Sequence, residues 1–175
     1  MFARALSAIG LLAATSLQLC AGEVEVSGVH LCCASCVKGV DAALKDVDGV
    51  SGVKSDRESK TVKFTADDDK AAEAGIKALA KGGFHGTARH GDAKLEFPDS
   101  GAKDGAKASQ IKIKQVHLCC GACVRAADEA ISKVSGVANV TADRDASATA
   151  VPGGRVSLQG AGNELRGPGF NATVE

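Results

Sequence analysis

The sequence has few aromatic residues and no excess of charge of either sign. It contains no Trp, no Tyr and five Phe among 175 residues. Hydrophobic cores must therefore be built mainly from Val, Leu, Ile and Ala, in one ordinary domain or in two small ones of about 70 residues. The formal net charge is zero, and no run of Lys and Arg is interleaved with aromatic residues. Both absences argue against nucleic acid as a partner.

Cysteine, in contrast, is concentrated in two places. The motif His-Leu-Cys-Cys-x-x-Cys begins at His30 and recurs 87 residues later at His117, and six of the seven cysteines lie in these two copies. A coincidence of this kind at one fixed offset is very improbable by chance. We therefore interpret the chain as a duplicated thiol site with the remaining residues as its scaffold.

The residues around each motif predict a strand followed by a helix. Alternating Val24 and Val26 indicate a half-buried strand, and a shift of parity before the thiols predicts a β-bulge. Helical spacing of Val37, Val40 and Leu44 then predicts a helix that begins inside the motif and ends at residues 48–49, where a glycine can adopt a left-handed cap.

The remainder of the first copy adds two strands, a helix and a last strand or hairpin. The strands are expected at 50–56 and 60–65, the helix at 71–81 after an acidic start, and the last element at 84–97. Residues 98–109, rich in Gly, Ala, Lys and Asp, are expected to form a flexible linker. The second copy matches closely up to Arg144 and then diverges, with glycines that weaken its second helix.

This order predicts an α+β protein with two domains, at residues 23–97 and 110–175. Each domain has the order strand, helix, strand, strand, helix, strand. Right-handed crossovers fold that order into a ferredoxin-like βαββαβ unit, a four-stranded antiparallel sheet with two helices on one face. The first domain, which has the better second helix, is expected to be the more stable of the two.

Residues 1–22 have the layout of a secretory signal peptide. One Arg precedes an apolar run that is too short for a permanent transmembrane helix, and small residues follow it. The chain is therefore expected to be exported to the periplasm or the extracellular space, with no stable membrane span after cleavage. A lipoprotein anchored at Cys20 is the alternative, although bulky Leu19 before that cysteine is unfavourable.

Each motif can place two sulfurs within reach of one ion. Soft thiolates favour Cu(I), with Hg(II) and Zn(II) as alternatives. The second cysteine of each pair, Cys36 or Cys123, is expected in the first helical turn, where the helix dipole should lower its thiol pKa. Such an open loop can bind a soft ion through two or three ligands and can hand it on.

Each half also resembles the heavy-metal-associated domain, the ferredoxin-like module of copper chaperones, copper-transporting ATPases and periplasmic mercury-binding proteins. By this resemblance the metal-binding pairs are Cys33 with Cys36 and Cys120 with Cys123. Gly83-Phe84 and Gly169-Phe170 match the family's Gly-aromatic step near the metal loop. The resemblance implies binding and exchange of a soft ion rather than enzymatic turnover, with a metal transporter or another metal-binding module as partner.

The motifs depart from the family pattern at the residues before the first cysteine of each pair. Cys32 and Cys119 are additional thiols, and we expect them to join the metal site as third ligands. The alternative is that they point away, since neighbouring residues on an extended chain face opposite sides. His30 and His117 are interpreted as solvent-facing strand residues, with an occasional role as metal ligands as the alternative.

Two other functions compete with metal binding. Six cysteines in an exported protein can form structural disulfides, although bridges within such short loops would restrain little chain. A Cys-x-x-Cys pair at a strand-to-helix junction can also serve a thiol-disulfide oxidoreductase, although the strand order expected around such a motif is missing. The sequence leaves open the identity of the ion and whether the two loops share it.

Overall fold

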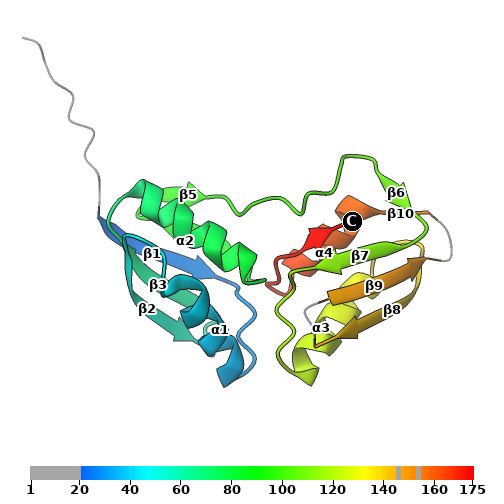
Figure 1. Ribbon diagram of the computed structural model, residues 1–175, viewed down its shortest axis with the longest axis horizontal. Helices are drawn as coiled ribbons and strands as arrows, with labels where there is room; N and C mark the ends of the chain where they lie inside the picture. The colour runs from blue at the N-terminus through cyan, green and yellow to red at the C-terminus, as the bar shows by residue number, and fades with distance from the viewer. Residues whose placement is uncertain (1–20, 145–146, 153–154) are drawn as a thin grey trace, which may run out of the picture.

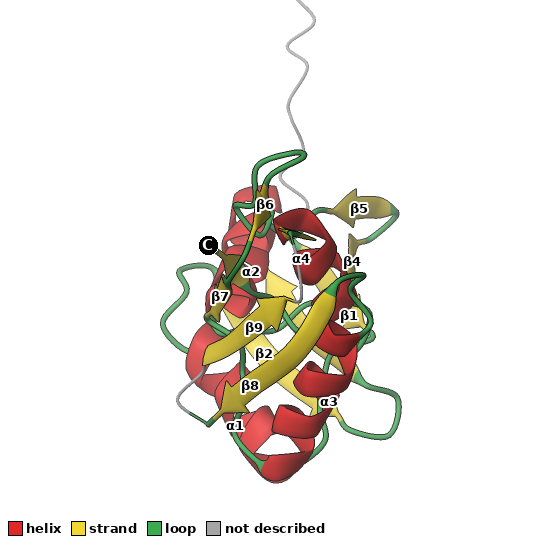
Figure 2. Cartoon of the chain, turned by 90° about the vertical axis from the view of Figure 1, so that its right-hand side faces the viewer, coloured by secondary structure: helices red, strands yellow, loops and turns green. Residues whose placement is uncertain are grey.

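The computed structural model describes residues 21–144, 147–152 and 155–175. The predicted signal peptide therefore lies outside the described residues except for its last two positions, and so does Cys20. Two α+β domains stand side by side, with the cysteine loops facing each other between them (Figure 1). Figure 2 views the molecule from the side of the second domain, with strands β8 and β9 in front of β2.

The first domain contains two helices and a five-stranded antiparallel sheet with the strand order β2-β3-β1-β4-β5. Its elements are β1 (Gly22–Ser27), α1 (Ala34–Leu44), β2 (Val50–Asp56), β3 (Thr61–Ala66), α2 (Asp69–Lys81), β4 (Thr87–His90) and β5 (Ala93–Leu95). The first four strands have the ferredoxin-like order that was predicted. Residues 84–97 take the hairpin form of the expected last element, because the chain turns at Gly91 and β5 pairs back on β4 as a fifth strand.

Strand β1 shows why this sheet forms. Val24 and Val26 are fully buried, whereas Glu23 and Glu25 alternate with them on the other face. Lys63 of the paired strand β3 lies 2.8 Å from a carboxylate oxygen of each glutamate. The alternating pattern thus sets the register, because a slip by one residue would expose the valines.

The second domain repeats the order, with its first strand, second helix and last strand shorter than in the first domain. They are β7 (Ile111–Lys114), α3 (Gly121–Ser132), β8 (Val137–Asp143), β9 (Ser147–Pro152), β10 (Val156–Ser157), α4 (Leu158–Arg166) and β11 (Thr173–Val174). The sheet order β11-β7-β9-β8 is again the ferredoxin-like order and has four strands. The predicted α+β fold with two ferredoxin-like units is therefore confirmed.

The connection between the domains packs more closely than a flexible linker would. Strand β6 (Lys107–Ala108) pairs with β10, Val174 N donates to Ser100 O at 2.9 Å, and Arg166 Nη2 donates to Pro98 O at 2.8 Å. A Cβ at Gly162 of helix α4 would lie only 2.7 Å from Ser100 Oγ. The glycine that weakens α4 thus lets residues 98–109 lie against this helix.

No bulge is found before the thiols, which corrects the predicted one. Instead, the residue directly after each of β1 and β7 lies in the left-handed region. These residues are Gly28 (φ 77°) and Gln115 (φ 59°). This residue reverses the side-chain parity without an extra residue in the ladder. Both following helices also end earlier than predicted, at Leu44 and Ser132, before short turns that lead into the next strands.

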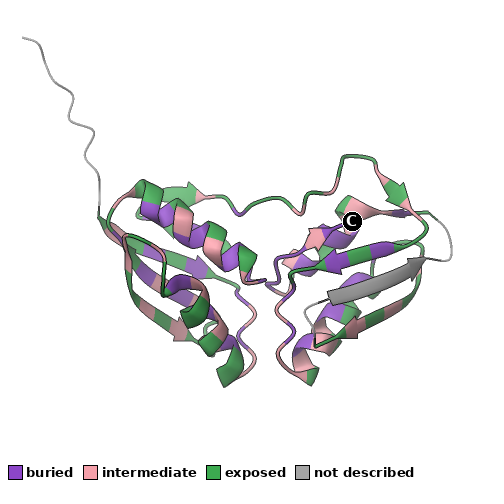
Figure 3. Ribbon diagram, in the orientation of Figure 1, coloured by how far each residue is buried: buried purple, intermediate pink, exposed green. Residues whose placement is uncertain are grey.

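The buried residues form one cluster that runs through both domains. Figure 3 shows them where the helices face the sheets and where the domains meet. At the junction Phe84 and Phe170 form an antiparallel bridge, His85 N donates to Gly169 O at 3.0 Å, and Asn171 N donates to Gly83 O at 2.9 Å. Each domain thus gives the other the same contacts, as in a two-fold symmetric dimer.

Candidate metal centre

The two cysteine motifs fold alike. Cys33 and Cys120 are the N-cap residues of α1 and α3, in extended conformation with φ of −150°. Cys36 and Cys123 lie in the first turn of these helices and are fully buried. Within each pair the sulfurs are close, at 3.7 Å from Cys33 Sγ to Cys36 Sγ and 3.5 Å from Cys120 Sγ to Cys123 Sγ.

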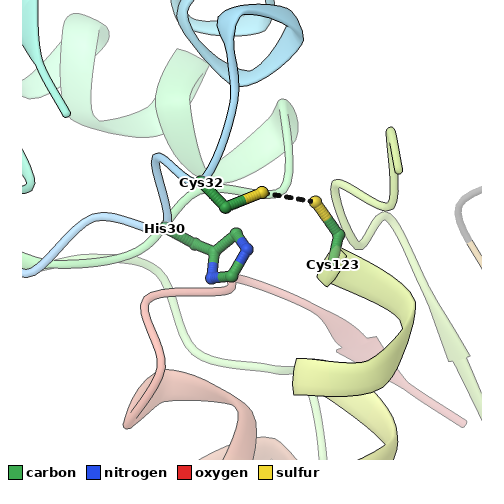
Figure 4. Close-up of side chains that lie close together, drawn as sticks. All are labelled: His30, Cys32 and Cys123. Atoms are coloured by element: carbon green, nitrogen blue, oxygen red, sulfur yellow. Dashed lines mark hydrogen bonds between the residues drawn. The ribbon is translucent and has the colours of Figure 1, made fainter. Parts of the chain in front are cut away.

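The additional cysteine of each motif, Cys32 or Cys119, points toward the other domain. Cys32 Sγ lies 3.4 Å from Cys123 Sγ and 3.5 Å from Cys120 Sγ, and the first of these contacts is drawn in Figure 4. Cys119 Sγ correspondingly lies 3.5 Å from the sulfurs of both Cys33 and Cys36. The structure therefore contradicts the alternative in which Cys32 and Cys119 point away from the pairs.

All six sulfurs thus form one group, which we call the six-sulfur cluster: Cys32, Cys33, Cys36, Cys119, Cys120 and Cys123. Their contacts range from 3.4 to 4.0 Å, and all six are free thiols in the structure. The sequence predicted each of these residues as a candidate ligand. It did not predict that the two motifs meet, because nothing in either motif alone indicates how the domains dock.

Two glycines make this meeting possible. Gly83 (φ 84°) and Gly169 (φ 91°) each lie directly on the backbone that leads into the other domain's cysteine loop. A Cβ on Gly83 would lie 2.8 Å from Gln115 O, and one on Gly169 would lie 2.5 Å from His30 N. Any side chain at these positions would push the loops apart, which gives the Gly-aromatic steps of the sequence a role at the domain interface.

The histidines of the motifs pack in the same interface. The rings of His30 and Phe170 stack with centroids 4.2 Å apart, and those of Phe84 and His117 lie 4.4 Å apart. Nε2 of both histidines is buried without a hydrogen-bond partner. Desolvation lowers the pKa of both side chains, so that the neutral imidazole is favoured. The interpretation of these residues as solvent-facing is therefore wrong, because each histidine is covered by the other domain.

The N-cap thiols are the acidic ones. Burial alone would raise the pKa of Cys33, but the nearby Cys36 N–H and the Cys119 thiol outweigh it and lower this pKa to about 6, without a regular capping hydrogen bond. The Cys123 N–H lowers the pKa of Cys120 in the same way. Desolvation instead raises the pKa of Cys123. The prediction of a lowered pKa for the second cysteine is thus wrong at Cys123, where burial outweighs the helix N-terminus.

The additional thiols are the least acidic. Desolvation raises the pKa of both Cys32 and Cys119, and contacts with neighbouring thiols raise it further. Two arginines lie beside these residues at equivalent positions. Arg57 Nη2 donates to Cys32 O at 3.0 Å, and Arg144 Nη2 donates to Cys119 O at 3.3 Å. A positive charge therefore stands next to each loop, where it favours anionic sulfur.

The cluster offers several overlapping places for an ion. Within the described residues, four groups of three ligand atoms have all their atoms within 4.8 Å of one another. The groups are Cys32 with Cys33 and Cys120, Cys33 with Cys36 and Cys119, Cys119 with Cys120 and Cys123, and His30 with Cys32 and Cys123. Three of the four groups combine residues of both domains. Figure 4 shows one of these three, with His30 and Cys32 facing Cys123 across the interface.

Weaker sequence features have structural roles. Asp68 caps α2, accepting a 2.6 Å hydrogen bond from Ala71 N, as the acidic start predicted. His90 is buried, with Nδ1 2.8 Å from Asp69 Oδ1. Asn171, part of a glycosylation sequon, is buried, and its Nδ2 donates to Ala80 O at 3.1 Å. The Asn171 amide therefore donates a hydrogen bond across the domain interface.

None of the helices among the described residues has the length and hydropathy needed to cross a lipid bilayer. Residues 23–85 match the protein family described as the heavy-metal-associated domain. Among solved structures, the N-terminal soluble domains of CopA from Bacillus subtilis are similar at 16% identity, with 90% of this chain and 95% of that chain covered and a TM-score of 0.34. A comparison with curated proteins gives no match.

Proposed function

We propose that this chain, whose residues 23–85 belong to the heavy-metal-associated domain family, binds Cu(I) in preference to other soft ions. Its role is delivery, buffering or detoxification of that ion outside the cytoplasm. It is not proposed to be an enzyme: the ion is its cargo, and the partner that gives or receives it is a metal transporter or another metal-binding module.

The observation that supports this proposal is the gathering of six free thiols within 4.0 Å of a neighbouring thiol. Thiolates are the preferred ligands of soft cations, and Cu(I) accepts two or three of them. Among the described residues no carboxylate joins the four candidate ligand groups. Hard ions such as Mg²⁺ and Ca²⁺, which need oxygen ligands, are therefore poor candidates.

Anaerobic metal loading tests this function. The reduced full chain is incubated separately with Cu(I), Zn(II) and Hg(II), desalted, and analysed for bound metal and for free thiols. Retention of Cu(I) against a competing chelator that removes Zn(II) supports the proposal. A control in which all six cluster cysteines are replaced by Ser should retain none. Failure of the reduced protein to retain any soft ion would exclude the function.

Export is part of the proposal and rests on the sequence of residues 1–22. Expression of the full chain in a bacterial host, followed by fractionation and mass spectrometry, tests it. A mature N-terminus at residue 22 or 23 in the periplasm is the expected product. A lipid-modified N-terminus at Cys20 would instead identify the lipoprotein alternative.

A thiol-disulfide redox function is the second candidate. The lowered pKa of Cys33 favours it, because a thiolate near neutral pH attacks disulfides readily. Reduction of insulin disulfides by the metal-free chain, at a rate above that of free dithiothreitol, would support this second function. A rate equal to that of dithiothreitol alone favours metal binding.

A further inference from the structure

We propose that the six-sulfur cluster binds one polynuclear group of about four Cu(I) ions that the two domains share, rather than one ion in each loop. This inference rests on the proposed function, because it requires that a soft ion is bound. It goes further by assigning the number of ions, the bridging sulfurs and the interface as a part of the site.

The first argument is the sharing of ligands. Five of the six sulfurs belong to two of the four ligand groups, and only Cys36 belongs to one. Separate mononuclear sites would need separate sulfurs. A thiolate has more than one lone pair and can bridge two soft cations, so that overlapping groups are what a bridged cluster needs. Three groups of three sulfurs and one of His30 with two sulfurs would hold about four ions.

The second argument is the spacing of the sulfurs. A metal–sulfur bond of about 2.3 Å puts two sulfurs about 4.6 Å apart on a linear two-coordinate ion and about 4.0 Å apart on a trigonal one. The contacts in the cluster are 3.4 to 4.0 Å, both within and between the loops. The sulfur pairs in contact are therefore nearer to the trigonal spacing than to the linear one, which favours three ligands per ion.

The third argument is charge. Six thiolates carry about six negative charges once their protons have left to solvent, and four monovalent ions would leave about two. Arg57 and Arg144, each hydrogen-bonded to the backbone of its own cysteine loop, supply two positive charges at equivalent positions. The site is thus close to neutral overall, which limits the cost of holding an anionic cluster in a half-buried place.

Measuring stoichiometry and metal–metal scattering tests the proposal. The full chain carrying Cys20→Ser, whose only thiols are those of the cluster, is reduced and titrated anaerobically with Cu(I) supplied as its acetonitrile complex. We expect cooperative uptake of about four ions per chain, a copper–copper shell in X-ray absorption, and a monomer by light scattering. Two ions per chain, bound independently and without copper–copper scattering, would overturn the shared cluster and leave the proposed function intact.

A variant of the interface gives a second, independent test. Gly83→Ala combined with Gly169→Ala adds two Cβ atoms that collide with the opposite loop but leaves every cysteine in place. Its uptake should fall to about one ion per loop, with loss of cooperativity and of copper–copper scattering. Gly91→Ala is the matched control, because Gly91 has a similar positive φ of 57° with nothing within 4 Å of its Cβ position. A double variant that folds and still takes up four ions cooperatively would contradict the inference.

Discussion

The two domains agree in their first halves and differ in their second halves. Both cysteine motifs, the helices that follow them and the arginines at 57 and 144 are equivalent in sequence and in place. Helix α2 has 13 residues, however, whereas α4 has 9 and contains two glycines. The first half of each domain holds the sulfurs, so that the chemistry of the cluster constrains its sequence directly. The second half is free to diverge except where it reaches the interface, at the retained Gly-Phe steps.

The shorter helix is compensated by the chain that connects the domains. Residues 98–109 cover α4 and bond to it and to β11. The first domain has no need of such a covering segment, because the buried residues of α2 pack on its own sheet. One domain is thus self-supporting, whereas the other includes a piece of sequence that looks like a linker.

The largest effect should come from removing equivalent ligands in the two domains. Cys33→Ser and Cys120→Ser each remove a sulfur that belongs to two ligand groups. If the cluster is shared, both variants should weaken Cu(I) retention equally and by more than about 100-fold, beyond what changes around a metal ligand cause. Competition against a graded series of Cu(I) chelators measures this. Independent sites would instead leave half of the bound copper at its original affinity in each variant.

Most of this arrangement could be predicted within one domain but not between the two. The alternation of Val24 and Val26, the helical stripe through Val40 and Leu44, and the repeat itself predicted two α+β units and their cysteine loops. Local pattern determines these elements because each buries its own apolar face. Strand β5 was predicted only as part of a hairpin, since no apolar alternation marks a three-residue edge strand.

The docking of the domains depends on shape rather than on pattern. Nothing in the sequence around His30 shows that Phe170 will cover it, and a histidine that alternates with apolar residues such as Val29 and Leu31 is typical of the exposed face of a strand. The parity shift before the thiols predicts a bulge, whereas the structure has a left-handed residue at 28 and at 115. Glycine favours that conformation, but Gln does not, so the pattern shared by the two repeats does not identify it.

A second comparison tests which domain is the more stable. Leu79 of α2 and Leu165 of α4 are both fully buried, and truncation of either to Ala should lower the free energy of unfolding by about 2–5 kcal/mol.

Amide hydrogen exchange of the metal-free wild type should show slower exchange in α2 than in α4, because α2 is longer and contains better helix formers. Faster exchange in α2 than in α4 would reverse the predicted ranking.

A smaller effect separates two buried helix glycines. A Cβ at Gly75 of α2 would lie 2.6 Å from the ring of Phe64 in the core, whereas one at Gly162 of α4 would lie 2.7 Å from Ser100 Oγ of the connecting segment and 3.6 Å from Val174. We expect Gly75→Ala to lower the free energy of unfolding by about 1–3 kcal/mol through overpacking. In Gly162→Ala the gain in helix propensity, about 1 kcal/mol, should offset the displacement of Ser100.

Urea unfolding of both glycine variants, followed by circular dichroism, measures these changes. Each variant is the control for the other, because both replace a buried glycine in the second helix of a domain. Equal losses of stability would mean that residues 98–109 are held against α4 as rigidly as the core of the first domain.

The smallest effect concerns His85 and Asn171, the residues that follow the two Gly-Phe steps. The backbone N–H of each donates to the other domain, from His85 to Gly169 O and from Asn171 to Gly83 O. Desolvation lowers the pKa of His85 from 6.5 to about 4, so the unfolded chain binds a proton more tightly than the folded one. Its contribution to stability is therefore complete above pH 6.5 and is lost as the pH falls toward about 4.

His85→Asn, which copies the second domain, should flatten this part of the pH profile of unfolding in metal-free, reduced protein. His30 and His117, whose pKa values are also lowered, should leave a residual slope, and a variant with the full wild-type slope would show that His85 is protonated equally well in both states.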